Sequence, residues 1–229
     1  MLSPVWPRRL PTPYGVIRIF CNVGFSAIAS AGLASAEPVV IAALGDSLTQ
    51  GYGLPASQGF VPQLEEWLLS KGLDARIINA GVSGDTTAGG LSRIEWTLTP
   101  EVDGVIVALG GNDLLRGIDP AASRSNLEGI LEITGSRDLP VLLVGMDSPS
   151  NYGPDFEAAF DAMYPELAAK YGTLFYPNFL AALIKADDRQ SALEEFMQGD
   201  GIHPNAKGIE LVVEDIGPQV AELVRLAND

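Results

Sequence analysis

Cysteine and histidine each occur only once in this chain of 229 residues, as Cys21 and His203. A single cysteine can form neither an internal disulfide nor a multi-thiolate zinc site, so neither stabilises the fold. A single histidine argues against two-metal hydrolytic sites, which generally draw on several imidazole ligands. Any acid–base chemistry that requires an imidazole must therefore use His203.

Basic residues are also scarce. The chain has 14 Lys and Arg against 29 Asp and Glu, a formal net charge of -15 and a pI of about 4.3. Nucleic-acid binding needs a cationic surface to meet the phosphates, so this charge argues against DNA or RNA as a partner. The 47% of hydrophobic residues is ordinary for a soluble globular enzyme.

Acidic residues are absent from the first 36 positions, which contain three arginines. An apolar stretch over 19–33 follows, and Ala34-Ser35-Ala36 supplies a small-x-small site. These are the parts of a secretory signal. The sequence therefore predicts a signal peptide over 1–36, cleaved after Ala36, and a periplasmic or secreted domain over 37–229 without stable membrane insertion. Cleavage would remove the lone cysteine. An uncleaved anchor and a start codon placed too early are the alternatives.

Short apolar runs alternate with longer amphipathic stretches after residue 37. The runs, nearly continuous in Val, Ile, Leu and Ala, predict buried strands over Val39–Leu44, Arg76–Asn79, Gly104–Leu109, Val141–Gly145 and Leu174–Tyr176. The other stretches predict helices over 58–71, 86–98, 121–137, 155–171 and 205–226. In the last, Pro218 predicts a kink or two helices in tandem. The alternation implies an α/β fold, with a five-stranded parallel sheet covered on both faces.

Polar, glycine-rich segments follow the first three predicted strands, and a fourth precedes the last helix. They are Gly45–Gly53, Asn79–Thr86, Gly110–Asp113 and Gly199–Asn205. In a parallel α/β sheet, functional loops lie beyond the carboxyl ends of the strands. We therefore expect these four segments to meet at one edge of the sheet.

These loops contain the groups that acyl transfer requires. Ser47 follows a strand and can act as nucleophile, with His203 as its base. Asp200 lies three residues before His203, so its carboxylate can reach Nδ1 and leave Nε2 facing the serine. The backbone N–H groups of Ser47 and Gly84 and the Asn112 amide can stabilise an oxyanion. The sequence predicts Ser47, Asp200 and His203 as catalytic residues.

The four segments resemble the four blocks of the SGNH (GDSL) hydrolase superfamily. The matching residues are Gly-Asp-Ser-Leu at 45–48, Gly84, Gly-Gly-Asn-Asp at 110–113 and Asp-x-x-His at 200–203. The resemblance implies a flavodoxin-like three-layer α/β/α sandwich and the roles given above. The chain is most similar to the thioesterase I, lysophospholipase and arylesterase group. This implies a small-molecule acyl ester or thioester as partner, and no cofactor. Carbohydrate O-deacetylation is the alternative activity within the superfamily.

Other classes fit the sequence less well. A metallophosphoesterase could use Asp46, Asn112, Asp200 and His203 as ligands, but such sites generally need more histidines. The chain has neither the Gly-x-Ser-x-Gly elbow of α/β-hydrolases nor a complete Gly-x-Gly-x-x-Gly after its first strand. A non-catalytic binding module on the same fold stays open, because fold does not fix function.

Several polar residues of the four loops are predicted to have structural roles. Asp46 should hold the loop of Ser47, and Asp113 should do similar work beside Asn112. Caps or helix starts are predicted at Asp85, Thr86 and Asn205. Tyr152 is predicted either to line an acyl groove or to pack within its loop.

Overall fold

The computed structural model of the chain describes residue 3 and residues 37–148, 150–184 and 194–228. Within it, Glu37–Asp229 form one compact unit. The predicted signal peptide and its cleavage site fall in 1–36, which lie outside the described residues apart from Ser3. Both therefore stay predictions.

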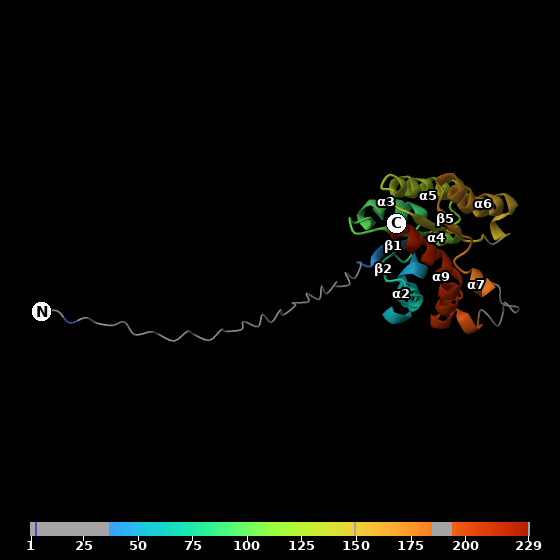
Figure 1. Cartoon of the computed structure of the whole chain (residues 1–229). Coiled ribbons are helices and arrows are strands. Elements are labelled where there is room, and N and C mark those ends of the chain that lie inside the picture. Colours follow the sequence, from blue (N-terminus) through green and yellow to red (C-terminus); the bar gives the residue numbers. More distant parts are fainter. Residues whose placement is uncertain (1–2, 4–36, 149, 185–193, 229) are drawn as a thin grey trace. The chain divides into compact units, whose positions relative to one another are not determined.

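Five parallel strands form one sheet in the order β2-β1-β3-β4-β5. Three of them, β1, β2 and β5, are labelled in Figure 1. The strands are β1 (Val39–Gly45), β2 (Ala75–Gly81), β3 (Gly104–Ala108), β4 (Val141–Val144) and β5 (Leu174–Tyr176). Every residue of β1, β3 and β4 is buried, which explains their almost uninterrupted apolar sequences. The predicted five-stranded parallel sheet is confirmed, with small shifts at the strand ends.

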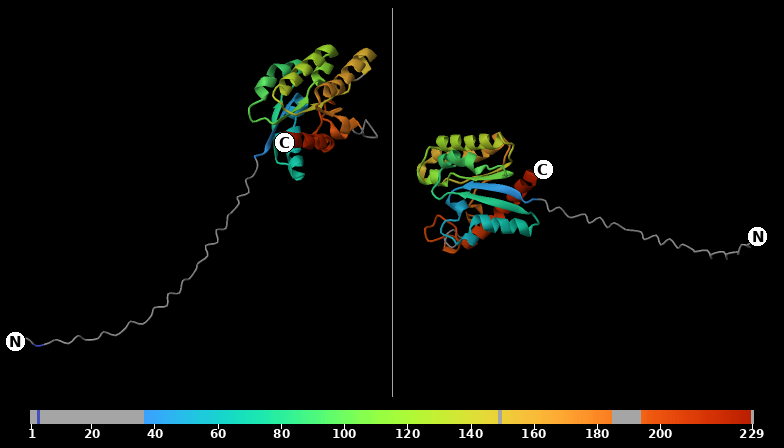
Figure 2. Two further views of the ribbon diagram at one scale, coloured as in Figure 1. Left: turned by 45° about the horizontal axis from the view of Figure 1, so that its top comes forward. Right: turned by 90° about the vertical axis from the view of Figure 1, so that its left-hand side faces the viewer.

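Helices cover both faces of the sheet, which lies between two helical layers in Figure 2. One layer contains α3 (Thr87–Thr97), α5 (Pro120–Gly135) and α6 (Pro154–Tyr171), and the other contains α2 (Phe60–Ser70) and α9 (Ala206–Asn228). These are the five predicted helices. The shorter elements missed by the prediction are α1 (Ser47–Gln50), α4 (Gly111–Leu115), α7 (Ala181–Ile184), η1 (Ala56–Gln58) and η2 (Ser150–Tyr152). Within the described ranges, no helix combines the length and the apolarity needed to cross a bilayer.

Each face of the sheet has its own apolar core, and the side chains of β1 divide between them. Ile41 and Ala43 belong to the core that contains residues of α2 and α9. Ala42 and Leu44 belong to the core that contains residues of α3, α5 and α6. Because successive side chains of a strand point to opposite faces, one apolar strand serves both cores and fixes the three-layer arrangement.

α9 continues as one helix through Pro218, so of the two predicted alternatives the tandem helices were wrong and the kink stays a prediction. Proline removes a backbone donor and crowds the preceding turn. Ile216 and Val220 on either side of it are nevertheless fully buried, and Gly217 gives room to the Trp67 ring. Burial on both sides of the proline therefore outweighs the lost hydrogen bond.

The chain leaves the neighbouring strands β1 and β3 toward opposite faces. β1 leads to α2 in one layer, and β3 leads to α5 in the other. In the 2-1-3-4-5 strand order this divergence opens a crevice beyond the carboxyl ends of the strands. The four predicted loops begin at or beside this crevice, which is where the candidate site lies.

Candidate active site

Ser47 begins α1 directly after β1, in a tight turn that Asp46 and Gly45 make possible. The Asp46 carboxylate caps the helix by accepting a hydrogen bond of 3.0 Å from the Leu48 backbone N–H. A Cβ at Gly45 would lie 2.0 Å from the Thr49 hydroxyl oxygen, so only glycine fits there. The predicted role of Asp46 in holding the loop of Ser47 is confirmed.

The structure brings Ser47, His203 and Asp200 into one chain of hydrogen bonds. His203 Nε2 lies 2.8 Å from Ser47 Oγ, and His203 Nδ1 lies 2.7 Å from Asp200 Oδ2. The other oxygen of Asp200 accepts the backbone N–H groups of Ile202 and His203. The bond from the imidazole, followed by these backbone bonds, lowers the pKa of Asp200 to about 2. The carboxylate therefore stays ionised.

The histidine loop is tied to the opposite rim of the site by Gln198, which sequence reasoning missed. Its backbone N–H donates to the carbonyl of His203 at 2.8 Å. Its side-chain amide donates to the carbonyls of Tyr52, at 2.8 Å, and Pro204, at 3.0 Å. The Tyr52 ring also packs against the His203 ring with 4.7 Å between centroids. Gln198 therefore holds the loop that carries His203, and Tyr52 packs against its imidazole ring.

Asn112 lies in α4, directly after β3, with its amide turned toward Asp46. Its Nδ2 donates to Asp46 Oδ2 at 3.2 Å, which fixes the amide orientation and leaves a second N–H available. Burial raises the pKa of Asp46 to about 6, although the Leu48 and Asn112 hydrogen bonds and the charge of His203 oppose the rise. The Asp46 carboxyl therefore changes charge in the weakly acidic range.

Gly84 lies in the exposed loop after β2, with a φ of +81° that favours glycine. Among the described residues, no acceptor is bonded to the backbone N–H of Gly84 or of Ser47. Gly84, Asn112, Ser47 and His203 all line the same pocket, while Asp200 lies behind the imidazole. The five predicted site residues are therefore brought together at one place.

This pocket has a volume of about 300 Å³ and a largely apolar wall. Its apolar lining residues are Leu48, Leu114, Leu115, Met146, Leu180 and Ile202. Tyr152 does not line it, because its ring packs on Phe156 with 4.7 Å between centroids. The packing alternative predicted for Tyr152 is thus the one observed. The described part of the chain has no group of three or more His, Cys, Asp or Glu side chains placed to hold a metal ion.

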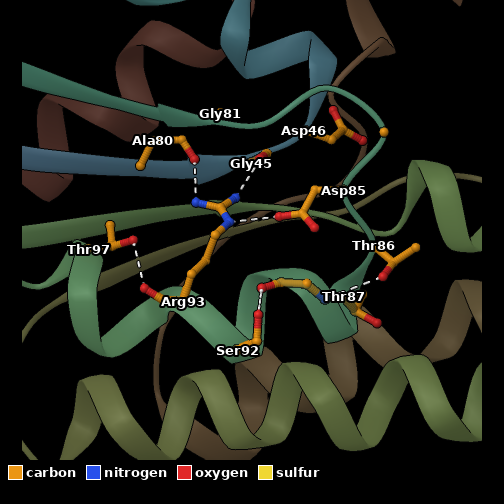
Figure 3. Close-up of polar contacts among 12 residues, drawn as sticks. Gly45, Asp46, Ala80, Gly81, Asp85, Thr86, Thr87, Ser92, Arg93 and Thr97 are labelled. Atoms are coloured by element: carbon orange, nitrogen blue, oxygen red, sulfur yellow. Dashed lines mark hydrogen bonds and ion pairs between the residues drawn. The ribbon is translucent and has the colours of Figure 1, made fainter.

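Behind the pocket, Arg93 of α3 joins the ends of two strands to the Gly84 loop, as Figure 3 shows. Its Nε pairs with Asp85 Oδ2 at 2.7 Å. Its terminal nitrogens donate to the carbonyls of Ala80, at 2.7 Å, and Gly45, at 2.9 Å. The predicted capping role of Asp85 was therefore wrong, since its carboxylate binds the guanidinium. Thr86 caps α3 as predicted, by accepting from the Gly89 N–H.

Asp113 and Asn205 have the structural roles that the sequence predicts. Fully buried, Asp113 accepts hydrogen bonds from the backbone and hydroxyl of Thr87 and from the Ser123 hydroxyl. It thereby joins α4 to α3 and α5. Asn205 caps the start of α9 by accepting from the N–H groups of Lys207 and Gly208.

Known proteins resemble this chain over almost its whole compact unit. The model of the GDSL-like lipase/acylhydrolase family matches residues 43–211. The chain is 36% identical to an esterase, TesA, of Pseudomonas aeruginosa over 192 residues, which are 83% of this chain and 91% of that protein. It is 34% identical to thioesterase 1/protease 1/lysophospholipase L1 of Escherichia coli K12, over 83% of this chain and 86% of that one.

A solved structure resembles the fold at higher identity. AlinE4, described as an SGNH-hydrolase family esterase, is 47% identical, with a TM-score of 0.66. The match covers 82% of this chain and 97% of that one. Sequence and fold therefore point to the same group of proteins.

Proposed function

Because the chain belongs to the GDSL-like lipase/acylhydrolase family, as its resemblance to SGNH hydrolases predicts, we propose that it is a serine esterase acting on acyl esters and thioesters. One observation carries the assignment to particular residues. Asp200, His203 and Ser47 form an unbroken chain of hydrogen bonds, of 2.7 Å and 2.8 Å, that ends at the mouth of an apolar pocket. This is the arrangement that activates a serine hydroxyl.

In the first half of the reaction, Ser47 Oγ attacks the acyl carbonyl while His203 Nε2 takes the hydroxyl proton. Asp200 keeps the proton of Nδ1 in place, so that Nε2 is the basic nitrogen, and it stabilises the imidazolium that forms. Its low pKa, about 2, suits this role because the carboxylate is charged at any working pH. His203 then gives the proton to the departing alcohol or thiol, and Ser47 is left acylated.

The developing oxyanion has three donors within reach of Ser47. They are the backbone N–H groups of Ser47 and Gly84, which have no acceptor among the described residues, and the second N–H of the Asn112 amide. Because Asp46 occupies the first N–H of Asn112, the amide cannot rotate freely. In the second half of the reaction, water attacks the acyl carbonyl while His203 takes its proton. His203 then returns the proton to Ser47 Oγ, and the carboxylic acid is released.

The wall of the pocket favours an acyl group with a hydrocarbon chain over an acetyl group on a sugar. Leu114, Leu115 and Ile202 line the pocket and would bury part of such a chain. The names of the two relatives, an esterase and a thioesterase/lysophospholipase, support the same substrate classes. We therefore expect the rate to depend on the length of the acyl chain.

The test is hydrolysis of a p-nitrophenyl ester series from acetate to palmitate, with and without EDTA. We expect activity that survives EDTA and falls by about 10⁴–10⁶-fold in Ser47→Ala. The matched control is Ser92→Ala, an exposed serine of α3, which should keep full activity. A fluorophosphonate should also phosphonylate Ser47 with loss of fluoride, which adds the mass of the phosphonyl group to the peptide that contains Ser47. Equal activity in Ser47→Ala would refute the assignment.

Export is a separate part of the proposal. It rests on the basic, apolar and Ala-x-Ala parts of residues 1–36. Expression in a Gram-negative host should give extracytoplasmic protein whose first residue is Glu37. Intact protein that keeps Met1, or that stays in the membrane fraction, would contradict this.

A further inference from the structure

One arginine that contacts the Gly84 loop has no carboxylate partner among the described residues. Arg76, Arg93 and Arg124 each pair with an Asp or Glu. Arg116 instead donates from Nη2 to the backbone carbonyl of Gly84, at 2.6 Å. Arg137 also donates to a carbonyl, that of Leu98, at 2.6 Å. Arg116 differs in that its acceptor belongs to a residue that lines the pocket.

Gly84 needs external support more than the other oxyanion donors do. Ser47 is held by the buried turn at the end of β1, and Asn112 is held by its bond to Asp46. Gly84 lies in an exposed turn that is closed by one backbone bond, from the Asp85 N–H to the Val82 carbonyl. With a φ of +81° and no side chain, its two peptide planes would rotate easily.

Arg116 limits this freedom from the side of α4. The helix contains Asn112 and ends at Leu115, and its C-cap is Arg116, whose backbone N–H bonds to the Asn112 carbonyl at 3.2 Å. The guanidinium holds the carbonyl, and the turn bond holds the N–H, of the one peptide unit that joins Gly84 to Asp85. This anchors the Gly84 Cα beside the pocket that Gly84 lines, so the preceding peptide, which carries the Gly84 N–H, turns about a fixed point.

We propose that Arg116 is a positioning residue for the oxyanion hole. The short helix α4 would supply one donor directly, through Asn112, and orient a second one through the Arg116–Gly84 bond. This inference rests on the proposed esterase function. It gives Arg116 an effect on transition-state stabilisation, because both acylation and deacylation pass through an oxyanion that the Gly84 N–H contacts.

The variants Arg116→Met and Arg116→Lys test the proposal. Methionine keeps an extended side chain without a donor, and lysine retains one charged donor. With p-nitrophenyl butyrate we expect Arg116→Met to lower kcat about 10-fold, which is less than the 10²–10³ that loss of a whole donor causes. KM should change less than twofold, and Arg116→Lys should recover most of the rate.

The second readout is inhibition by butylboronic acid, whose adduct with Ser47 carries an oxygen in the oxyanion position. Arg116→Met should weaken this inhibition by the same factor as it lowers kcat, with an unchanged unfolding temperature. The control is Arg76→Ala, which removes the same charge at the other end of β2 and should change neither value.

Two outcomes would overturn the proposal. In one, Arg116→Met hydrolyses the ester and binds the boronic acid as the wild type does. In the other, Arg116→Met raises KM for a phosphate-bearing acyl-CoA and leaves the uncharged ester unaffected, which would make Arg116 a substrate anchor. Failure of the esterase function itself is recognised separately, because the wild type would then be inactive or Ser47→Ala would be active.

Discussion

The two carboxylates nearest to the reacting atoms lie in opposite environments. Asp46, beside the proposed nucleophile Ser47, is 3% exposed and its pKa is raised to about 6 by burial. Asp200, beside the proposed base His203, has a side chain 37% exposed, and the imidazole and backbone N–H groups lower its pKa to about 2. The half of the site around Ser47 is thus built into the core, whereas the half around His203 lies on a surface loop.

This contrast predicts how substitutions divide between activity and stability. A change at Asp46 disturbs buried partners, so it should alter folding as well as turnover. A change at Asp200 disturbs an exposed loop, so it should alter turnover with little effect on folding. The predictions below test this division in order of decreasing effect.

The largest effect is expected for Asp200→Asn. The amide cannot hold the same imidazole tautomer, so kcat should fall by about 10³–10⁴-fold, while urea unfolding at pH 7 should change little. Because the folded pKa of Asp200 lies below its usual value, its contribution to stability, which solvent screening keeps small at this exposed site, is present above about pH 4 and is lost as the pH falls toward 2. Asp119→Asn, at the exposed cap of α5, is the matched control. A large loss of stability at pH 7 would contradict the division.

The next effect is expected for Asp46→Asn. The new amide cannot accept from Asn112 and Leu48 together as a carboxylate does, so Asn112 should lose its fixed orientation and kcat should fall by about 10–100-fold. If Asp46 acts through Asn112, Asp46→Asn should lower kcat by a smaller factor in an Asn112→Ala background than in the wild type. Full additivity in kcat would contradict this coupling.

The same variant should reveal the raised pKa of Asp46 in stability measurements. A folded pKa of about 6 against 3.8 means that wild-type stability from this group is fully present below pH 4 and is lost as the pH rises through 6. The Asp46→Asn variant has no group that titrates in this range. Raising the pH from 4 to above 6 should therefore change the difference in unfolding free energy between wild type and variant by about 3 kcal/mol, in favour of the variant. Urea unfolding at several pH values measures this shift, and a constant difference would show that Asp46 is not perturbed.

The sequence predicted those parts of the molecule whose signals are local. The apolar run of Val39–Leu44 predicted a buried strand, and the loops after the strands predicted the positions of Ser47, Gly84 and Asn112. The short helices α1 and α4 escaped prediction because four or five residues do not establish a helical period.

Contacts between distant residues left no such signal. Gln198 binds the carbonyl of Tyr52 across 146 positions, Arg93 binds that of Gly45 across 48, and Arg116 binds that of Gly84 across 32. A backbone carbonyl is the same acceptor in every residue, so the sequence does not show which one an amide or guanidinium will bind. The fold and the positions of the candidate site residues were therefore predictable, whereas the side chains that hold the site through distant backbone carbonyls were not.

A moderate effect is expected for Arg93→Lys. This variant tests the hydrogen bonds between Arg93 and the ends of β1 and β2, next to Ser47. Lysine keeps the charge opposite Asp85 but cannot bind two strand-end carbonyls at once as the guanidinium does. Stability should fall by about 2 kcal/mol, near the sum of two hydrogen bonds. Urea unfolding measures this, with Arg225→Lys on the exposed surface of α9 as control. Equal losses in the two variants would show that the strand-end bonds contribute nothing.

The smallest effect is expected for Gln198→Ala, in the bridge between the two halves of the site. Its amide holds the histidine loop to the Tyr52 carbonyl through an exposed bond, so its loss should leave unfolding nearly unchanged. The imidazole should then sample positions away from Ser47, and kcat should fall about 3–10-fold at constant KM. Gln58→Ala, in the nearby turn η1, is the control. A Gln198→Ala protein that loses stability but keeps its kcat would mean that the base loop is part of the folded core, which would break the contrast between the two halves.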